Sequence, residues 1–178
     1  MIDLTTGRFV LREGVELFPG MTRKEFFESP LYKTELFHES DKDDLKNYSY
    51  FLKTQNIDGF EMSINIVVSS YDYVTRIELT RPDFYNWPDW PTDVTEEDYA
   101  YAIKKYNDEF LQHQVQGSIR EGNEISFRSS WGSITSSINL RHTPKVMITI
   151  RYREVPFLKA KGMTFGHIDI FGNTNHNK

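Results

Sequence analysis

The sequence contains no cysteine among its 178 residues. This absence excludes disulfide bonds, thiolate metal sites, iron–sulfur clusters and a cysteine nucleophile, and it is compatible with a reducing compartment. Apolar runs are also short, far below the roughly 20 residues that span a bilayer. Residues 1–7 lack the basic and apolar regions of a signal peptide. We therefore expect a cytoplasmic protein that does not enter a membrane.

Motifs of common catalytic and cofactor sites are absent as well. The sequence has no glycine-rich phosphate-binding loop, no serine nucleophile elbow and no calcium-binding loop. Its five histidines do not show the close spacing of a zinc site, and His167 with Asp169 is the nearest approach to one. We therefore assign no catalytic residue, no metal ligand and no cofactor from the sequence, which leaves open whether the chain is an enzyme.

Positive charge is scarce in the first two thirds of the chain. Residues 1–118 contain 12 Lys and Arg against 22 Asp and Glu, a net charge of −10, whereas residues 119–178 carry a net charge of +5. The acidic part disfavours nucleic acid as a partner and favours a basic protein. An ordinary solvated surface would explain the same distribution, because the two parts can interleave in space.

Aromatic residues are abundant, at 15% of the chain, and they accompany alternating apolar and polar residues. This alternation predicts antiparallel strands with one face on a core and one face in water. An Asp58-Gly59 pair marks a hairpin turn between two of these strands. The expected strands lie at about 8–11, 15–18, 48–52, 60–68, 74–80, 125–131, 134–140 and 146–152.

Two amphipathic helices are expected between the strands. Thr22 with Glu25 forms a capping box for a short helix that ends before Pro30. Thr95, followed by acidic residues, begins a longer helix whose apolar residues recur every three or four positions. The sequence therefore predicts an α+β domain over residues 1–161, with a tail at 162–178. Its curved antiparallel sheet of six to eight strands would carry both helices on one face, in the order ββ-α-βββ-α-βββ.

Two segments are candidates for binding a protein partner. Residues 35–44 form an acidic, loop-like stretch, and residues 82–94 contain three prolines and four aromatic residues. Acidic side chains steer association with a basic surface, and aromatic residues in a proline-stiffened loop make good anchors. The loop could equally fold over the open end of the core. The candidate residues are Glu39, Asp41, Asp43, Asp44, Phe84, Tyr85, Trp87 and Trp90.

The strand pattern resembles that of small bacterial immunity proteins, which neutralise toxins of contact-dependent growth inhibition and related polymorphic toxin systems. The resembling parts are residues 7–11 with residues 17–22 leading into a helix, and residues 126–134 followed by residues 148–152. The resemblance implies a non-enzymatic cytoplasmic inhibitor that binds and occludes a toxin domain. It assigns no functional residue. The basic final third does not match a surface made for a basic toxin.

Two other functions remain open from the sequence. The polar face of the last strands could line a small-ligand or enzyme site. Its side chains would be Arg128, Ser130, Thr135, Asn139 and Arg151. Alternatively, the chain could be a structural or accessory protein of phage type that associates with itself. The sequence alone does not give the oligomeric state.

Overall fold

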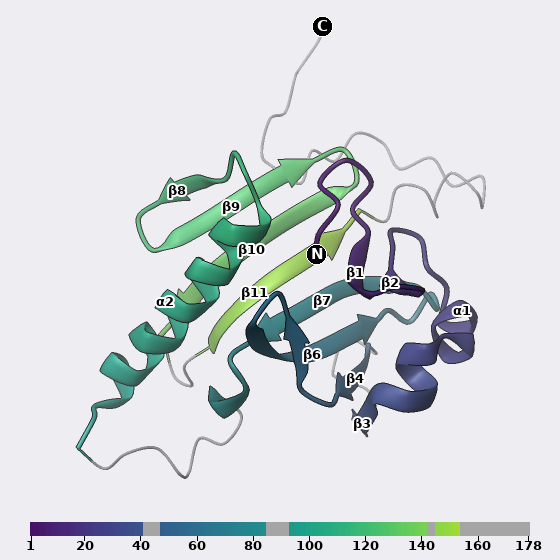
Figure 1. Cartoon of the computed structure of the whole chain (residues 1–178), viewed down its shortest axis with the longest axis horizontal. Helices are drawn as coiled ribbons and strands as arrows, with labels where there is room; N and C mark the ends of the chain where they lie inside the picture. The colour runs from purple at the N-terminus through teal and green to yellow at the C-terminus, as the bar shows by residue number, and fades with distance from the viewer. Residues whose placement is uncertain (41–46, 85–92, 142–144, 154–178) are drawn as a thin grey trace, which may run out of the picture.

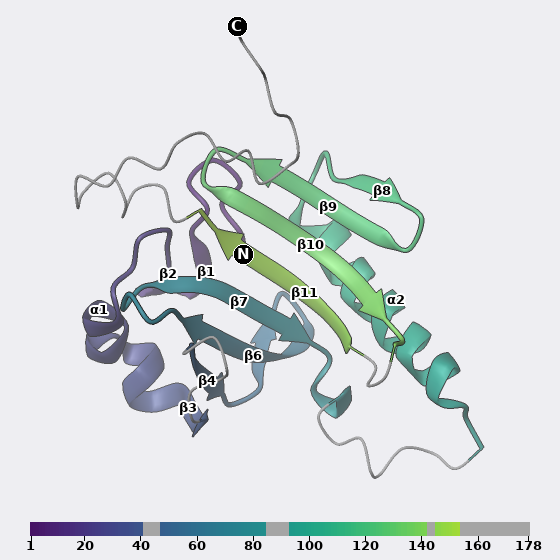
Figure 2. The same cartoon turned by 180° about the vertical axis from the view of Figure 1, so that it is seen from behind.

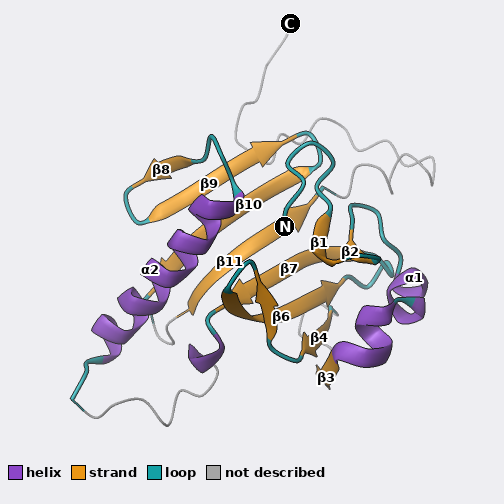
Figure 3. Ribbon diagram, in the orientation of Figure 1, coloured by secondary structure: helices purple, strands orange, loops and turns teal. Residues whose placement is uncertain are grey.

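The computed structural model describes residues 1–40, 47–84, 93–141 and 145–153. Strands predominate in it over helices (Figure 3). The elements in chain order are β1 (Phe9–Arg12), β2 (Val15–Leu17), α1 (Arg23–Glu28), η1 (Leu31–Glu35), β3 (Leu36–Ser40), β4 (Tyr48–Leu52), β5 (Gln55–Ile57), β6 (Phe60–Val68), β7 (Val74–Thr80), α2 (Glu96–Gln114), β8 (Ile119–Glu121), β9 (Glu124–Ser129), β10 (Gly132–Asn139) and β11 (Lys145–Tyr152).

Nine strands form one antiparallel sheet in the order β3-β4-β6-β7-β11-β10-β9-β8, with β5 paired to β6 beside this path. The sheet twists from β3 at one edge to β8 at the other (Figure 1). The short ribbon β1-β2 forms a separate two-stranded sheet. These features confirm the predicted α+β class with an antiparallel sheet.

Among the described residues, one face of the sheet is covered by the helices, and no helix packs on the other, which we call the open face. Directly paired residues share a face, so the row Tyr50, Ile66, Ile77, Ile150 and Ile134 lines the covered face across five strands. Phe26 of α1 and Phe110 of α2 belong to the same buried core as this row. Both helices therefore pack on one face, and Figure 2 shows the sheet from its uncovered side.

Local signals place the helix ends as predicted. Thr22 and Glu25 form the capping box of α1, and Ser29 ends this helix in an extended conformation before Pro30. Thr95 caps α2, where its side chain accepts a hydrogen bond from the Asp98 backbone. These signals act within one helical turn, which is why they can be recognised without knowing the fold.

The prediction of a loop at residues 35–44 is wrong for its first half, because residues 36–40 form β3. Among the described strands, this one pairs with β4 alone and forms an edge of the sheet. An edge strand is stabilised by backbone hydrogen bonds and needs no alternating apolar face. For the same reason the sequence pattern does not predict β5 and β8, which have three residues each. The expected tail at 162–178 and its boundary at residue 161 lie outside the described residues.

Candidate functional site

An apolar groove of about 470 Å³ lies at the β3 edge of the sheet. β4 pairs with β6 as far as Phe51 opposite Asn65, and β5 takes over this role from Gln55 opposite Met62. Between these two points the chain leaves β6, and the gap in the pairing creates the groove. Its lining comprises Phe37, His38, Phe51, Leu52, Lys53, Thr54, Ser63, Ile64 and Pro82.

Phe37 is the most exposed aromatic side chain of this site, at 77% of its full accessibility. The register between β3 and β4 shifts between Leu36 and His38, which makes Phe37 the extra residue of a β-bulge. A bulge bends its strand and redirects the side chain of the extra residue. The ring of His38 lies 6.0 Å from that of Phe51, so the groove next to Phe37 has an aromatic wall. A large apolar side chain is thereby held in water at the rim of an apolar groove.

The described charges of β3 are partly balanced within the fold. Glu39 Oε1 lies 4.0 Å from Arg23 Nη2, and the Glu39 side chain remains 41% exposed. The Arg23 guanidinium also stacks over the Tyr48 ring at 3.8 Å and lies 3.6 Å from Asp72. Such an exposed, long ion pair contributes little to stability, and the negative charge of Glu39 remains largely directed to solvent. Asp41, Asp43 and Asp44, the other acidic candidates, lie outside the described residues.

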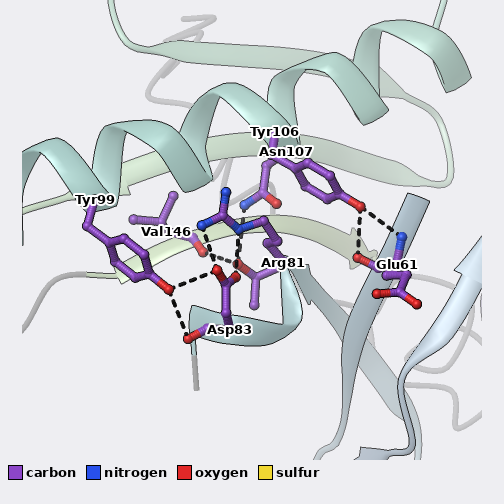
Figure 4. Close-up of polar contacts among 8 residues, drawn as sticks. Glu61, Arg81, Asp83, Tyr99, Tyr106, Asn107 and Val146 are labelled. Atoms are coloured by element: carbon purple, nitrogen blue, oxygen red, sulfur yellow. Dashed lines mark hydrogen bonds and ion pairs between the residues drawn. The ribbon is translucent and has the colours of Figure 1, made fainter. Parts of the chain in front are cut away.

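A polar cluster fixes the start of the predicted aromatic segment to α2 (Figure 4). The Arg81 guanidinium donates two hydrogen bonds of 2.6 Å to the Asp83 carboxylate, and the Tyr99 hydroxyl donates a third of 2.8 Å. Burial alone would raise the pKa of Asp83, but the hydrogen bonds from Arg81 and Tyr99 outweigh it and lower that pKa below its ordinary value. Pro82, between the two charged residues, is thereby held in the wall of the groove.

Of the four aromatic candidates, the structure describes Phe84 alone. This side chain is partly buried and packs against a small buried cluster of Ala100, Ile103 and Val146. Phe84 therefore packs between α2 and the sheet. This placement agrees with the alternative interpretation, in which the aromatic loop folds over the core. Tyr85, Trp87 and Trp90 lie outside the described residues.

The groove connects the two segments that the sequence singled out. β3 leads directly into the acidic run, Pro82 leads into the aromatic run, and both line the same groove although they are more than 40 residues apart. Sequence reasoning missed Phe37, because a segment interpreted as a loop gives no reason to examine its side chains for exposure. A phenylalanine inside an acidic stretch was the signal that could have found it.

The open face of the sheet does not gather all five residues of the alternative ligand site. Arg128 and Arg151 lie in one row, separated by Ser133, and Thr135 lies in the next row. Ser130, however, precedes β10 while Asn139 ends it, so the two lie at opposite ends of the strand. Arg76 extends the row beyond Arg151, and its Nε lies 2.7 Å from the Glu78 carboxylate. Part of the positive charge on this face is thus neutralised within the sheet.

Compared with known protein families, curated proteins and solved structures, the chain matches none of them. Within the described ranges, no three His, Asp or Glu side chains are grouped as a metal site would require. In the same part of the chain, no helix has the length and apolar character to cross a bilayer. The geometry of the groove and of the charged clusters therefore carries the functional argument.

Proposed function

We propose that the chain is a non-enzymatic binding protein of the immunity type, which occludes a basic toxin domain with the β3 edge and its groove. The observation that carries the proposal is the exposure of Phe37 at the rim of an apolar groove. Binding energy in protein interfaces is concentrated in a few apolar or aromatic anchors that insert into complementary pockets. Phe37 would be such an anchor, and the groove would accept an apolar side chain of the partner.

The negative charge near the β3 edge supports a basic partner. Glu39 projects from β3 and begins a run that contains three aspartates, within a part of the chain whose net charge is −10. Lys53, which also lines the groove, donates its ammonium group to the Thr34 carbonyl oxygen at 2.7 Å. Its charge is therefore directed toward the backbone of η1. Acidic residues near a binding edge raise the association rate with a basic surface more than they raise the final affinity.

The direct test measures the activity of the toxin domain encoded by the adjacent gene while the concentration of this protein increases. We expect inhibition that saturates near one molecule of protein per toxin domain. Full toxin activity in an excess of folded protein would refute the immunity function.

Two pairs of variants test the assigned surface. Phe37→Ala should weaken inhibition by about tenfold or more, the effect of removing an interface anchor. Ile119→Ala is the matched control, since Ile119 is 62% exposed on β8, the opposite edge strand. Glu39→Lys should slow association, whereas Glu121→Lys on β8 should change it less. If Phe37→Ala inhibits as well as the unmodified protein, binding occurs at another surface.

A further inference from the structure

A second polar cluster lies around Asp108 of α2, near β8 and β10 and away from the β3 edge. One row on the covered face of the sheet contains Ile64, Leu79, Ile148, Ser136, Ile125 and Arg120. Ser136 and Arg120 are the polar members of this otherwise apolar row. Both are turned toward α2, where each donates a hydrogen bond to the Asp108 carboxylate, at 2.6 Å from Ser136 and 3.2 Å from Arg120.

Lys104, one helical turn before Asp108, completes the cluster. Its ammonium group donates to the same carboxylate oxygen that accepts from Ser136. The side chains of Lys104 and Asp108 are only 6% and 11% exposed, whereas that of Arg120 is 53% exposed. Two cations therefore surround one anion, and the site carries one uncompensated positive charge next to a buried ammonium group. Burying a charge is costly unless an opposite charge and hydrogen bonds compensate it.

The hydrogen-bond donors of this cluster that remain unused are those of Lys104 and Arg120. Asp108 accepts three hydrogen bonds, which nearly saturates its two oxygens. An ammonium group has three donors and a guanidinium has five, and Asp108 accepts one from each. No other side chain in the described part of the chain accepts from Lys104 or Arg120. An oxyanion is bound by cationic groups whose N–H donors are not already used in other hydrogen bonds.

A groove of about 340 Å³ lies over these donors, between α2 and the β8-β9 hairpin. Tyr101, Gln112 and Asn123 add neutral hydrogen-bonding groups to its lining. Lys105 and Glu109 also line it and balance each other, so the formal charge of the lining is +1. The volume is at the small end of the range for ligand pockets, which limits the ligand to a small molecule or a single terminal group.

We propose that this groove binds a small oxyanion, the carboxylate or phosphate group of a ligand, between the Lys104 ammonium and the Arg120 guanidinium. The bound anion would pair with the second cation and satisfy donors that Asp108 leaves unused. The site lies away from the β3 edge and does not depend on the immunity function. A purely structural cluster, which ties α2 to β8 and β10, is the competing explanation.

Titrations followed by backbone amide NMR distinguish the two explanations. The full chain is titrated separately with sodium phosphate and with sodium succinate, at constant ionic strength maintained with sodium chloride. We expect saturable shifts of amide signals around Lys104, Arg120 and Asn123. Saturation by phosphate alone assigns the site to phosphate groups, by succinate alone to carboxylates, and by both to oxyanions in general. Shifts that remain linear and small with both anions would refute the proposal.

Arg120→Gln is the decisive variant, because the half-exposed Arg120 side chain can be shortened while the buried Lys104–Asp108 pair is kept. It should weaken anion binding by about tenfold, the effect of losing one charge-assisted hydrogen bond. Arg151→Gln is the matched control, since it removes the same charge from the open face of the sheet and should bind as the unmodified protein does. Thermal unfolding of both variants confirms that they are folded. Equal binding by Arg120→Gln and the unmodified protein would also refute the site.

Discussion

The indole N–H of Trp131 donates a 2.8 Å hydrogen bond to the carbonyl oxygen of Leu4, 127 residues earlier in the chain. Trp131 lies in the turn between β9 and β10 and is 8% exposed. Gly7 adopts a φ of +76° directly beneath the indole ring. This contact attaches the N-terminal segment to the far half of the sheet, and the close approach depends on the missing side chain of Gly7.

The contact predicts a large difference between two glycine substitutions. A Cβ atom at Gly7 would lie 2.5 Å from Cδ2 of Trp131, closer than such atoms approach in proteins. Gly14 has a similar φ of +71° but nothing within 4 Å of its Cβ position. Gly14→Ala should therefore lose only the backbone preference, roughly 1–2 kcal/mol of unfolding free energy. Gly7→Ala should lose about 1–3 kcal/mol more, because the ring must move. Denaturant unfolding measures both, and equal losses would contradict the close contact.

The buried pair on α2 predicts that Asp108→Asn is strongly destabilising. The substitution leaves the Lys104 ammonium buried without its counter-charge, which should cost about 3–5 kcal/mol. Ser136→Ala removes one hydrogen bond to a charged group and should cost about 1.5–3 kcal/mol. Glu109→Gln, next to Asp108 but exposed, is the control and should change stability by less than about 0.5 kcal/mol. Chemical unfolding at neutral pH gives all three values. A small loss for Asp108→Asn would contradict the dependence of the fold on this buried ion pair.

Because the Tyr50 side chain is buried, we expect the protein to lose stability in alkali. Its side chain is fully buried among the rings of Phe26, Phe27 and Tyr32. Desolvation raises the pKa of Tyr50 from 10 to about 12. The unfolded chain therefore releases this proton first, and stability falls as the pH rises from 10 toward 12, by an amount on the order of 2 kcal/mol. Burial also raises the pKa of Tyr152, which adds to the same loss.

The variant Tyr50→Phe isolates this effect. It keeps the ring packing and removes the titrating hydroxyl, so the unfolding free energy should depend less on pH between 10 and 12. The slope contributed by Tyr152 should remain. Chemical unfolding at a series of pH values measures both proteins, and parallel curves would contradict the assignment to Tyr50.

Asp83 should make the stability of the protein fall as the pH decreases in the acidic range. Because its pKa is lowered in the folded chain, Asp83 stabilises the fold above its ordinary pKa of 3.8, and this contribution is lost as the pH falls through the lowered value. Asp83→Asn should be less stable at neutral pH by about 1 kcal/mol, a small value because the side chain is 42% exposed. The two proteins should converge in acid. Tyr99→Phe, which removes one donor, should shift the Asp83 titration upward in carboxyl NMR spectra.

Short-range features of the fold could be predicted from the sequence. The capping residues Thr22 and Thr95 begin their helices where expected. Asp58 and Gly59 have positive φ angles of 52° and 88° in the tight turn between β5 and β6. Tyr152 is buried, as the alternation of its strand predicts. Each of these depends on residues within a few positions of one another, or on the two-residue period of a strand.

The tertiary structure alone decided which distant residues meet. The sequence by itself determined the α+β class, because alternation and helical periodicity fix which face of each element is apolar. It did not determine the groove, since Phe37 and Pro82 line the same groove only when β3, β4, β6 and β7 take their order in the sheet. The cluster of Arg120, Ser136 and Asp108 depends in the same way on strand register and on where α2 crosses the sheet. Register and order are set by the packing of the whole core, which no local pattern encodes.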